Sequence, residues 1–514
     1  MASTTCFVVT VRATSITISN GEEASYLLST LIDMLTYEDE FAEDTKTLGF
    51  MYDKETDTLF LHKGVDIEYL QKCLGNIKVV YDPYHPFKPM KFEYEEIIPP
   101  RNEEQVDVID FITGAGYHNN ADQSQLFLVK SGGFGKTFCS GVGLCKLKMK
   151  TLIIMHRDAL RRQWFNSLFN MNGLTTKEVH EITSTEELEA IAKGKLKLDY
   201  DVYLMTHATF RASLARIQKM TDVMNITKNL GIGLKIIDEA HLEFRDTLIM
   251  DFCFNVKRNL YLTATAGRSG KDENSIFKHV FSNAVFYKPS ALLTDDAPKR
   301  WVNYSTVEVN THCKPNIYKY RVAGGKGMNP ASYGKWVIQY DKKHIHFKCI
   351  EELVKTAYEK DQYAKILIFL PLIDLCEDCV YYLKTHLDRD RDFQYDLDIR
   401  TICSKNSKKD NEYAKRSDII VTTIQSCGTG TDIKGITTII AASPFCSKIT
   451  AQQTFWRIRY MGKIGDYYDI FDSSVPMDRF WLKSRYKTFK HMALNIKHIV
   501  WSEDEEINND NNNH

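Results

Sequence analysis

The sequence of 514 residues describes a folded protein of nearly neutral charge. Hydrophobic residues make up 43% of the chain and charged residues 26%, which are ordinary globular values and exclude a wholly disordered or fibrous protein. The 66 Lys and Arg side chains against 67 Asp and Glu give a net charge of -1. This excludes a globally basic nucleic-acid-binding protein but leaves room for a local basic groove. At about 150 residues per domain, the length predicts roughly three domains.

The cysteines and the apolar runs indicate the cellular compartment in which we expect the protein. The 12 cysteines are scattered without regular spacing, which is typical of reduced thiols in an intracellular protein. The chain does not begin with a basic segment followed by a long apolar run, and no apolar run reaches the about 18 residues of a membrane helix. We therefore expect a soluble intracellular protein with no membrane partner.

Residues 1–95 predict a small α+β domain. The strand-like runs CFVVTV, TLFLH and IKVVY flank one amphipathic stretch near residues 26–35. Prolines at positions 83, 86, 89, 99 and 100 then indicate a domain boundary.

Two longer parts of the chain alternate apolar runs with helix-compatible segments. The runs QLFLV, TLIIM, VYLM, LKIID and NLYLTAT lie in residues 96–290, and ILIFL, DLDIRTI, DIIVTT, TTIIAA and DYYDIFD lie in residues 346–500. Buried strands separated by helices predict parallel sheets, so the fold class is α/β. Residues 291–345 are interpreted as a connection or insert. A basic segment ends the second domain, and residues 501–514 form an acidic, Asn-rich tail that we expect to be disordered.

A glycine-rich turn follows the run QLFLV. The segment KSGGFGKTF supplies the candidate residues Gly132, Gly133, Gly135, Lys136 and Thr137. Glycines let backbone N–H groups turn toward phosphates, the lysine reaches the β and γ oxygens, and the threonine hydroxyl binds Mg²⁺. The first glycine of the usual pattern is replaced by Lys130. The turn predicts a phosphate-binding loop, with a chance GKT at a helix start as the alternative.

Two adjacent carboxylates end a later apolar run. The segment LKIIDEAHLEF delivers Asp238 and Glu239 where a parallel strand ends, which is the edge at which such sheets bind ligands. We expect Asp238 to hold Mg²⁺ and Glu239 to orient and deprotonate the attacking water. His241 is a candidate for linking this site to the neighbouring domain. Capping of the next helix by the two carboxylates is the alternative.

The order of these motifs resembles the core of superfamily 2 helicases. A phosphate loop, DEAH at 238–241 and LTATAGR follow one another as in that family, and the resemblance covers roughly residues 100–475. GTGTDIKG and the N-terminal domain bring the sequence closest to the phage UvsW and eukaryotic XPB group, and to the transcript-release helicases of poxviruses and asfarviruses. The resemblance implies two tandem RecA-like domains that use ATP and Mg²⁺. It also implies a large DNA virus as the source, and hence the host cytoplasm and the virion as locations.

The resemblance implies roles for further residues. It assigns adenine recognition to Gln105 and coupling of hydrolysis to movement to Thr263 and Thr265, together with His241. The residues implied in nucleotide binding by the second domain are Gly430, Asp432 and Gln453. The residues implied in contact with nucleic acid are Arg157, Arg161, Gln163, Thr206, His207 and Thr423.

The sixth motif departs from the family's pattern. In QQTFWRIRY, Trp456 stands where a glycine is usual and Tyr460 where the second arginine is usual. Arg457 or Arg459 is therefore the candidate arginine finger, which stabilises charge on the γ-phosphoryl oxygens. A degenerate and inactive site is the alternative.

Basic residues in two segments add candidates for phosphate contact. They are Lys146, Lys148 and Lys150 in KLKMK, and Arg485, Lys487 and Lys490 in RYKTFKH. Basic groups neutralise phosphates and aromatic rings stack on bases. A solvated helix face is the alternative for both segments.

These observations predict an ATP-hydrolysing helicase or translocase that acts in viral transcription or replication. The expected partner is single-stranded or forked DNA, with RNA as the alternative, and we expect a monomer. The resemblance implies 3′-to-5′ movement, and by analogy with UvsW the N-terminal domain clamps DNA. A double-stranded DNA translocase without strand separation, an RNA helicase and a nucleotide-gated scaffold with little turnover are the alternatives.

Overall fold

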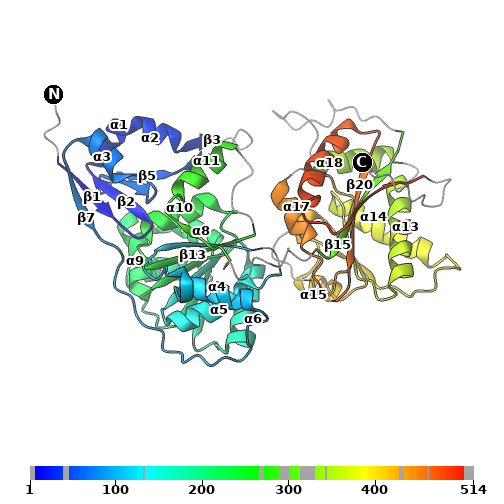
Figure 1. The fold of residues 1–514 in the computed structure, drawn as a ribbon, viewed down its shortest axis with the longest axis horizontal. Coiled ribbons are helices and arrows are strands. Elements are labelled where there is room, and N and C mark those ends of the chain that lie inside the picture. The colour runs from blue at the N-terminus through cyan, green and yellow to red at the C-terminus, as the bar shows by residue number, and fades with distance from the viewer. Residues whose placement is uncertain are drawn as a thin grey trace. The chain divides into compact units, whose positions relative to one another are not determined.

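The structure is a computed structural model of the chain. It describes residues 6–38, 46–130, 133–264, 271–289, 300–312, 330–341, 344–427, 433–445, 447–460 and 462–502. The chain divides into two compact units, Met1–Asp296 and Ala297–His514 (Figure 1). Among the described residues, no helix combines the length and the apolar character that crossing a bilayer requires.

The first unit begins with a mixed five-stranded sheet. In sheet order its strands are β5 (Phe50–Asp53), β6 (Thr58–His62), β2 (Ser15–Ser19), β1 (Phe7–Val11) and β7 (Ile77–Tyr81). β1 and β7 are parallel, and the other neighbours are antiparallel. The accompanying elements are α1 (Gly21–Leu27), α2 (Ser29–Met34), α3 (Ile67–Leu74) and the pair β3 (Thr36–Glu38) and β4 (Lys46–Leu48). Phe7 and Val9 are buried whereas Val8 between them is exposed, because one face of the sheet is covered.

A seven-stranded, all-parallel sheet follows in the same unit. In sheet order its strands are β10 (Val179–Ile182), β11 (Val202–Thr206), β9 (Thr151–Met155), β12 (Leu234–Ile237), β13 (Arg258–Thr263), β8 (Gln125–Val129) and β14 (Val285–Phe286). Its helices are α4 (Glu103–Thr113), η1 (Gly116–His118), α5 (Lys136–Leu147), α6 (Asp158–Asn172), α7 (Thr185–Ala192), α8 (His207–Ile217), α9 (Met220–Leu230), α10 (Phe244–Cys253) and α11 (Lys271–Val280). The central strands β9, β11, β12 and β13 are buried along their whole length. Strands covered on both faces appear in sequence as continuous apolar runs.

The N-terminal sheet packs against the parallel sheet's own helices. Phe60 of β6 lies against Phe252 of α10, with ring centroids 6.5 Å apart. The Thr14 hydroxyl donates to the carbonyl of Asp251 at 2.6 Å. Since Phe60 also belongs to the apolar core around α10, the two sheets of this unit share a buried interface. The predicted role of the N-terminal sheet in clamping DNA stays a prediction.

The second unit contains another seven-stranded, all-parallel sheet. In sheet order its strands are β17 (Ile399–Ile402), β18 (Ile419–Thr422), β16 (Ile366–Phe369), β19 (Thr438–Ala441), β20 (Gly465–Asp472), β15 (Val302–Val309) and β21 (Ile496–Val500). Its helices are α12 (Pro330–Tyr340), α13 (Ile345–Lys360), α14 (Ile373–Leu387), α15 (Lys408–Ala414), α16 (Ile424–Cys427), α17 (Lys448–Phe455) and α18 (Pro476–Phe489). The predicted α/β class with two parallel sheets after a small α+β part is confirmed.

Two strands of the second sheet lie where the sequence predicts none. β15 falls in residues 291–345, which the sequence assigns to a connection, yet it pairs with β20 from Val302 to Val309. β21 falls in the basic segment and pairs with β15. β21 is the edge strand and is mostly exposed, whereas β15 is paired on both sides and mostly buried but is interrupted by polar residues. Neither strand is a continuous apolar run, which is the pattern that predicts a buried parallel strand. The domain boundaries given by the sequence stay predictions.

A buried cluster of charges holds α18 to the second sheet. Arg485 of α18 is inaccessible to solvent, and its Nε donates to Asp469 Oδ2 on β20 at 2.9 Å. Its Nη1 donates to the carbonyl of Phe445 at 3.0 Å, and its Nη2 lies 3.8 Å from Asp478 Oδ1. The prediction that Arg485 follows nucleic-acid phosphates is therefore wrong, because its guanidinium is committed inside the core.

We expect Arg485→Met to lower the free energy of unfolding of the second unit by about 3–5 kcal/mol, because two carboxylates then stay buried without their cation. Denaturant titration of the full chain, followed by fluorescence and circular dichroism, measures the change. Lys487→Met removes an exposed charge from the same helix and should cost less than about 0.5 kcal/mol. Equal effects of the two substitutions would contradict the structural role of Arg485.

Candidate nucleotide-binding site

The glycine turn and the two carboxylates lie at one edge of the first parallel sheet. β8 leads into the turn, β12 leads into Asp238, and both strands pair with β13. Parallel strands bring their carboxyl ends to the same edge, which is where open α/β sheets bind ligands. The two motifs therefore belong to one sheet and one edge, as a shared site requires.

The glycine turn is held by residues at the start of α4. Gln105 Nε2 donates to the carbonyl of Phe134 at 2.8 Å, and Gln105 Oε1 accepts the N–H of Arg101 at 2.8 Å. The Arg101 guanidinium donates to the carbonyl of Gly133 at 3.2 Å. Gly135 has a φ of 102°, and a Cβ there would lie 2.6 Å from Gln105 Nε2. Only glycine fits this position. Gln105 is predicted from the sequence, whereas Arg101 is not, because no motif marks it.

Helix α5 begins at Lys136, directly after the turn. The first turn of a helix offers unpaired N–H groups and the positive end of the helix dipole, which together favour phosphate. Lys136 Nζ donates to the carbonyl of Lys130 at 2.8 Å, so the ammonium lies beside the loop. Thr137 follows in the first helical turn and is half-buried. Gly132 lies outside the described residues.

Asp238 is a buried carboxylate whose two oxygens both accept hydrogen bonds. Its side chain is 6% exposed. Oδ2 accepts the indole N–H of Trp164 at 2.8 Å, and Oδ1 accepts the N–H of Glu239 at 3.0 Å. Burial raises the pKa of Asp238 to about 6, the Glu239 charge adds to the rise, and the Trp164 N–H and the Lys136 ammonium counter it. Lys136 is thus within electrostatic reach of Asp238.

Glu239 has a strained backbone. Its φ is 51°, in the left-handed region that non-glycine residues seldom adopt and that is concentrated at functional sites. The strain fixes the direction in which the Glu239 side chain leaves the strand end. Glu239 Oε2 lies 3.4 Å from His241 Nδ1.

The residues at this edge fit a magnesium ion bound together with phosphates. Mg²⁺ prefers oxygen ligands and is usually held by one or two protein groups plus substrate phosphates. Asp238 supplies a buried carboxylate without a directly bound cation among the residues described, and Thr137 supplies a hydroxyl at the helix start. Within the described part of the chain, no group of three or more His, Cys, Asp and Glu side chains has metal-binding geometry. Binding at this edge therefore depends on phosphate oxygens as further ligands.

The structure brings two of the predicted coupling residues into contact. His241 Nδ1 and Thr263 Oγ1 are 2.9 Å apart, and both side chains are buried. Thr263 ends β13, the strand between the phosphate turn and the acidic pair. The same His241 nitrogen that is hydrogen-bonded to Thr263 therefore also lies 3.4 Å from Glu239 Oε2. Thr265 lies outside the described residues.

The basic residues predicted to contact nucleic acid differ in exposure. Arg157 is the N-cap residue of α6, and Gln163 is half-buried within that helix. Arg161 is 14% exposed, and its Nε lies 2.7 Å from Glu181 Oε2. Lys150 of KLKMK is buried and ion-paired with Asp199. Lys150 is therefore part of the core rather than a phosphate ligand.

Thr206 and His207 occupy the buried start of α8. The Thr206 hydroxyl accepts the N–H of Thr209 at 3.1 Å and so caps the helix. Burial lowers the pKa of His207 to about 3, with the charges of His156 and Arg211 adding to the shift. His207 therefore stays neutral at physiological pH. Contact of this pair with nucleic acid stays a prediction.

Two predicted residues of the second unit, Thr423 and Arg457, lie near the carboxyl end of β18. The Thr423 hydroxyl accepts the N–H of Ser426 at 3.1 Å at the start of α16. Arg457 Nη2 donates to the carbonyl of Cys427, the last residue of α16, at 2.6 Å. The segment that follows Cys427, with Gly430 and Asp432, lies outside the described residues.

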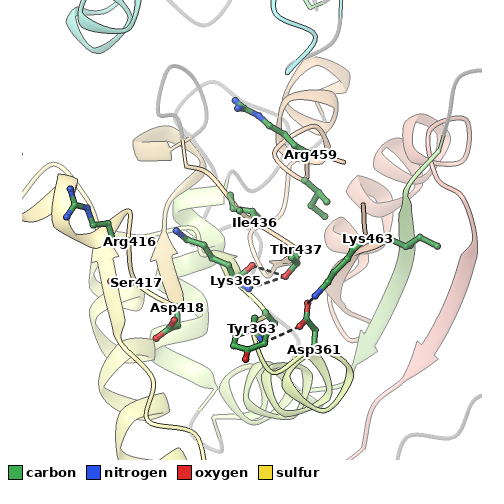
Figure 2. Close-up of a pocket in the computed structure, with 15 residues that line it drawn as sticks. Asp361, Tyr363, Lys365, Arg416, Ser417, Asp418, Ile436, Thr437, Arg459 and Lys463 are labelled. Atoms are coloured by element: carbon green, nitrogen blue, oxygen red, sulfur yellow. Dashed lines mark hydrogen bonds and ion pairs between the residues drawn. The ribbon is translucent and has the colours of Figure 1, made fainter. Parts of the chain in front are cut away.

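Gln453 and the two arginines of the sixth motif are separated by the end of α17. Gln453 is half-buried within the helix, Arg457 is half-buried beyond it, and Arg459 is exposed. Arg459 lines a pocket formed where β16, β18, β19 and β20 begin (Figure 2). The two arginines therefore lie at opposite ends of the parallel strands: Arg457 near the carboxyl end of β18 and Arg459 near the amino ends.

Comparison with known proteins shows which sequences this chain resembles. Residues 93–268 match the family described as "Type III restriction enzyme, res subunit", ResIII. A "DNA 3'-5' helicase XPB" of Kineococcus radiotolerans is 24% identical over 145 residues, which are 28% of this chain and 24% of that protein. The match thus spans about a quarter of the relative's length. These findings confirm the resemblance to superfamily 2 helicases.

Comparison with solved structures bears on the fold of the chain. "S. cerevisiae Dbp5 bound to RNA and ADP BeF3" is 12% identical with a TM-score of 0.50, covering 77% of this chain and 89% of that one. The structure of T4 UvsW is 15% identical with a TM-score of 0.35, covering 96% of this chain and 100% of that one. The Dbp5 likeness shows that the two parallel sheets belong to tandem RecA-like domains.

Trp164 is a second residue of this site that no sequence motif marks. It follows Gln163 in the run RDALRRQW, and its contact with Asp238 joins positions that are distant in the chain. We expect Trp164→Phe to raise the Mg²⁺ concentration needed for half-maximal ATP hydrolysis by about 10–100-fold, because the donor that orients Asp238 is lost. The acid limb of turnover should also move to higher pH, since the lost N–H lowers the pKa of Asp238. Magnesium titrations of turnover at several pH values measure both effects.

Trp481→Phe is the matched control, since it also removes a buried indole, but one that belongs to the second unit. It should leave the Mg²⁺ requirement unchanged. A Trp164→Phe protein that is merely less stable, with an ordinary Mg²⁺ requirement, would show that Trp164 acts in packing alone.

Proposed function

We propose that the protein is an ATP-dependent nucleic-acid helicase or translocase that couples ATP hydrolysis to movement on DNA. The observation that carries this proposal is the meeting of the glycine turn and the acidic pair at one edge of one sheet. The ResIII match over residues 93–268 supports it. The name of the XPB relative, a 3'-5' DNA helicase, supports DNA as partner and 3′-to-5′ as direction. Transcription or replication of a DNA virus is the proposed setting.

The proposed chemistry assigns a role to each group at the edge. Lys136 and the N–H groups at the start of α5 bind the β and γ phosphates. Thr137 and Asp238 hold Mg²⁺, which when bound neutralises charge on the phosphates. Glu239 orients a water molecule for in-line attack and accepts its proton. The buried position of Asp238 strengthens each of these electrostatic interactions, because solvent screens them less.

The contact between His241 and Thr263 supports a route for coupling. It links the residue that follows the acidic pair to the end of β13. A change at Glu239 that accompanies hydrolysis reaches the strand end through these two side chains. Such a link biases a two-state arrangement, which is how nucleotide turnover drives movement in proteins of this type.

We expect Glu239→Gln to lower the turnover number by about 10²–10⁴-fold with ATP binding retained, because only the general base is lost. Lys136→Ala should abolish both binding and turnover. ATP hydrolysis measured with single-stranded, duplex and forked DNA and with RNA, beside strand separation on the fork, checks this. Wild-type hydrolysis should rise with DNA.

Lys193→Ala is the control for these variants, because Lys193 is an exposed lysine at the end of α7 that is paired with Glu189. It should leave hydrolysis unchanged. Hydrolysis by Glu239→Gln at the wild-type rate would contradict the assignment of the base. ATP binding without stimulation of hydrolysis by any nucleic acid would favour a nucleotide-gated scaffold. Stimulation of hydrolysis by duplex DNA without strand separation would favour a translocase.

We assign the arginine finger to Arg457. Its guanidinium donates to the carbonyl of Cys427, which precedes Gly430 and Asp432 by a few positions in the sequence. Arg457→Ala is expected to lower the turnover number by about 10³-fold or more, because charge on the γ-phosphoryl oxygens is no longer stabilised. Single-turnover hydrolysis at saturating ATP measures this loss. Arg459→Ala is the comparison, and a greater loss there than at Arg457 would reverse the assignment.

A further inference from the structure

Helix α18 of the second unit is buried on one side and exposed on the other. The side chains that it buries recur at helical spacing and are Asp478, Trp481, Arg485, Thr488 and Phe489. The side chains exposed on the opposite side are Arg479, Phe480, Lys483, Tyr486, Lys487 and Lys490. Residues three or four positions apart lie on the same face of a helix. These six side chains therefore form one surface, here called the α18 face.

The α18 face carries cations without matching anions. From residue 476 to residue 500 the only acidic side chain is Asp478, which is buried. Among the residues that the structure describes, three lysines of the face have no ion-pair partner, namely Lys483, Lys487 and Lys490. The fourth cation, Arg479, has its Nη2 3.9 Å from Glu308 Oε1. Carboxylates one helical turn away would stabilise such lysines, but this face exposes none.

Two aromatic rings lie among these cations. Phe480 is 65% exposed and Tyr486 is 39% exposed. The Tyr486 ring lies 6.2 Å from the ring of Tyr304 on β15, measured between centroids, and Tyr304 pairs in register with the exposed Ile496 of β21. Basic groups neutralise phosphates and aromatic rings stack on bases, so this combination is typical of surfaces that bind single strands.

The helix dipole explains only part of this charge. Cations in the last turn of a helix are stabilised by its negative end, and Lys487 and Lys490 lie there. Lys483 lies about one turn earlier, where the effect of the dipole has faded. Phe480 carries no charge and is exposed to water. The stability of α18 alone therefore does not account for the whole face.

The α18 face begins at the end of the second sheet where nucleic-acid contact is predicted. α18 follows β20 after a short connection, so its first turn lies near the carboxyl end of that strand. β20 is parallel to β18 through β19 and β16, and the predicted contact residue Thr423 directly follows β18. β21 then runs parallel to β15, so α18 returns the chain to the amino ends of the strands. The face therefore leads away from the predicted contact along the length of the helix.

We propose that the α18 face binds a single-stranded segment of nucleic acid. The phosphates contact Lys483, Lys487 and Lys490, and the bases stack on Phe480 and Tyr486. This inference rests on the proposed function, because it takes the nucleic-acid partner of the helicase as the ligand. The exposed rings favour a single strand over a duplex, because only unpaired bases can leave their own stack to pack on a side chain.

Fluorescence anisotropy tests the proposal, with a labelled single-stranded oligonucleotide titrated by the full chain at several salt concentrations and without ATP. Lys483→Gln and Lys487→Gln should each reduce the slope of log association constant against log salt concentration by about 0.7, because one phosphate contact is lost. Phe480→Ala should weaken binding by at least about fivefold and leave that slope unchanged, because stacking is lost and charge is not.

Tyr381→Ala and Lys384→Gln are the matched controls. These two residues are an exposed aromatic ring and an exposed lysine three positions apart on α14 of the same unit, as Phe480 and Lys483 are on α18. Neither control should change the affinity or the salt dependence. Effects of the controls as large as those of the α18 variants would contradict a specific role for the α18 face.

The outcomes separate this inference from the proposed function. Oligonucleotide binding that is unchanged by Phe480→Ala and by the double substitution Lys483→Gln with Lys487→Gln would overturn this inference alone. A wild-type chain that binds no oligonucleotide would overturn the proposed function as well. If the same variants bind a polyglutamate peptide more weakly but the oligonucleotide normally, the face binds an acidic protein and not nucleic acid.

Discussion

A carboxylate kept out of water is the constraint on which the candidate site of the first unit depends. Asp238 is enclosed at the end of β12, and the Trp164 indole and the Glu239 N–H occupy its two oxygens. Burying a charge costs free energy unless partners compensate, and here the compensation is incomplete, as the raised pKa shows. The apolar strands around β12 and the helix that carries Trp164 thus maintain an unfavourable electrostatic position. A divalent cation bound together with phosphates would stabilise such a position.

Much of this arrangement follows from the sequence, and the reasons can be given strand by strand. β8, β9, β11, β12 and β13 are apolar runs because both faces of the sheet are covered, and parallel topology then brings GKT and DEAH to one edge. Arg101 and Trp164 were not predictable, because each acts through contacts with residues distant in the chain. Periodicity and spacing carry no signal for such contacts. β21 was missed because it is an edge strand that retains polar residues, and β15, which lies inside the sheet beside it, was missed because polar residues interrupt its apolar run.

Charged residues inside both units explain why composition is a poor guide to the surface. The buried Arg258 guanidinium donates hydrogen bonds to the carbonyls of Ile112 and Asn120, at 2.9 and 3.0 Å. Lys235 is paired with Asp251 in the core of the first unit, as Arg485 is with Asp469 in the second. A basic segment read from sequence therefore mixes side chains that face solvent with others that hold the sheets to their helices. Only the position of the acidic partner, often far along the chain, distinguishes the two kinds.

The docking of the N-terminal sheet has a practical consequence for dissecting the molecule. Phe60 is inserted beside Phe252, and Lys63 donates to the Ser124 hydroxyl at 2.9 Å. A fragment that starts at the first α/β domain would expose the apolar side of α10 to water and leave polar partners unsatisfied. Truncation experiments at this junction would therefore report on solubility and folding before they report on any contribution of the N-terminal sheet to substrate choice. Substitutions on its outer face, which preserve the interface, are the informative alternative.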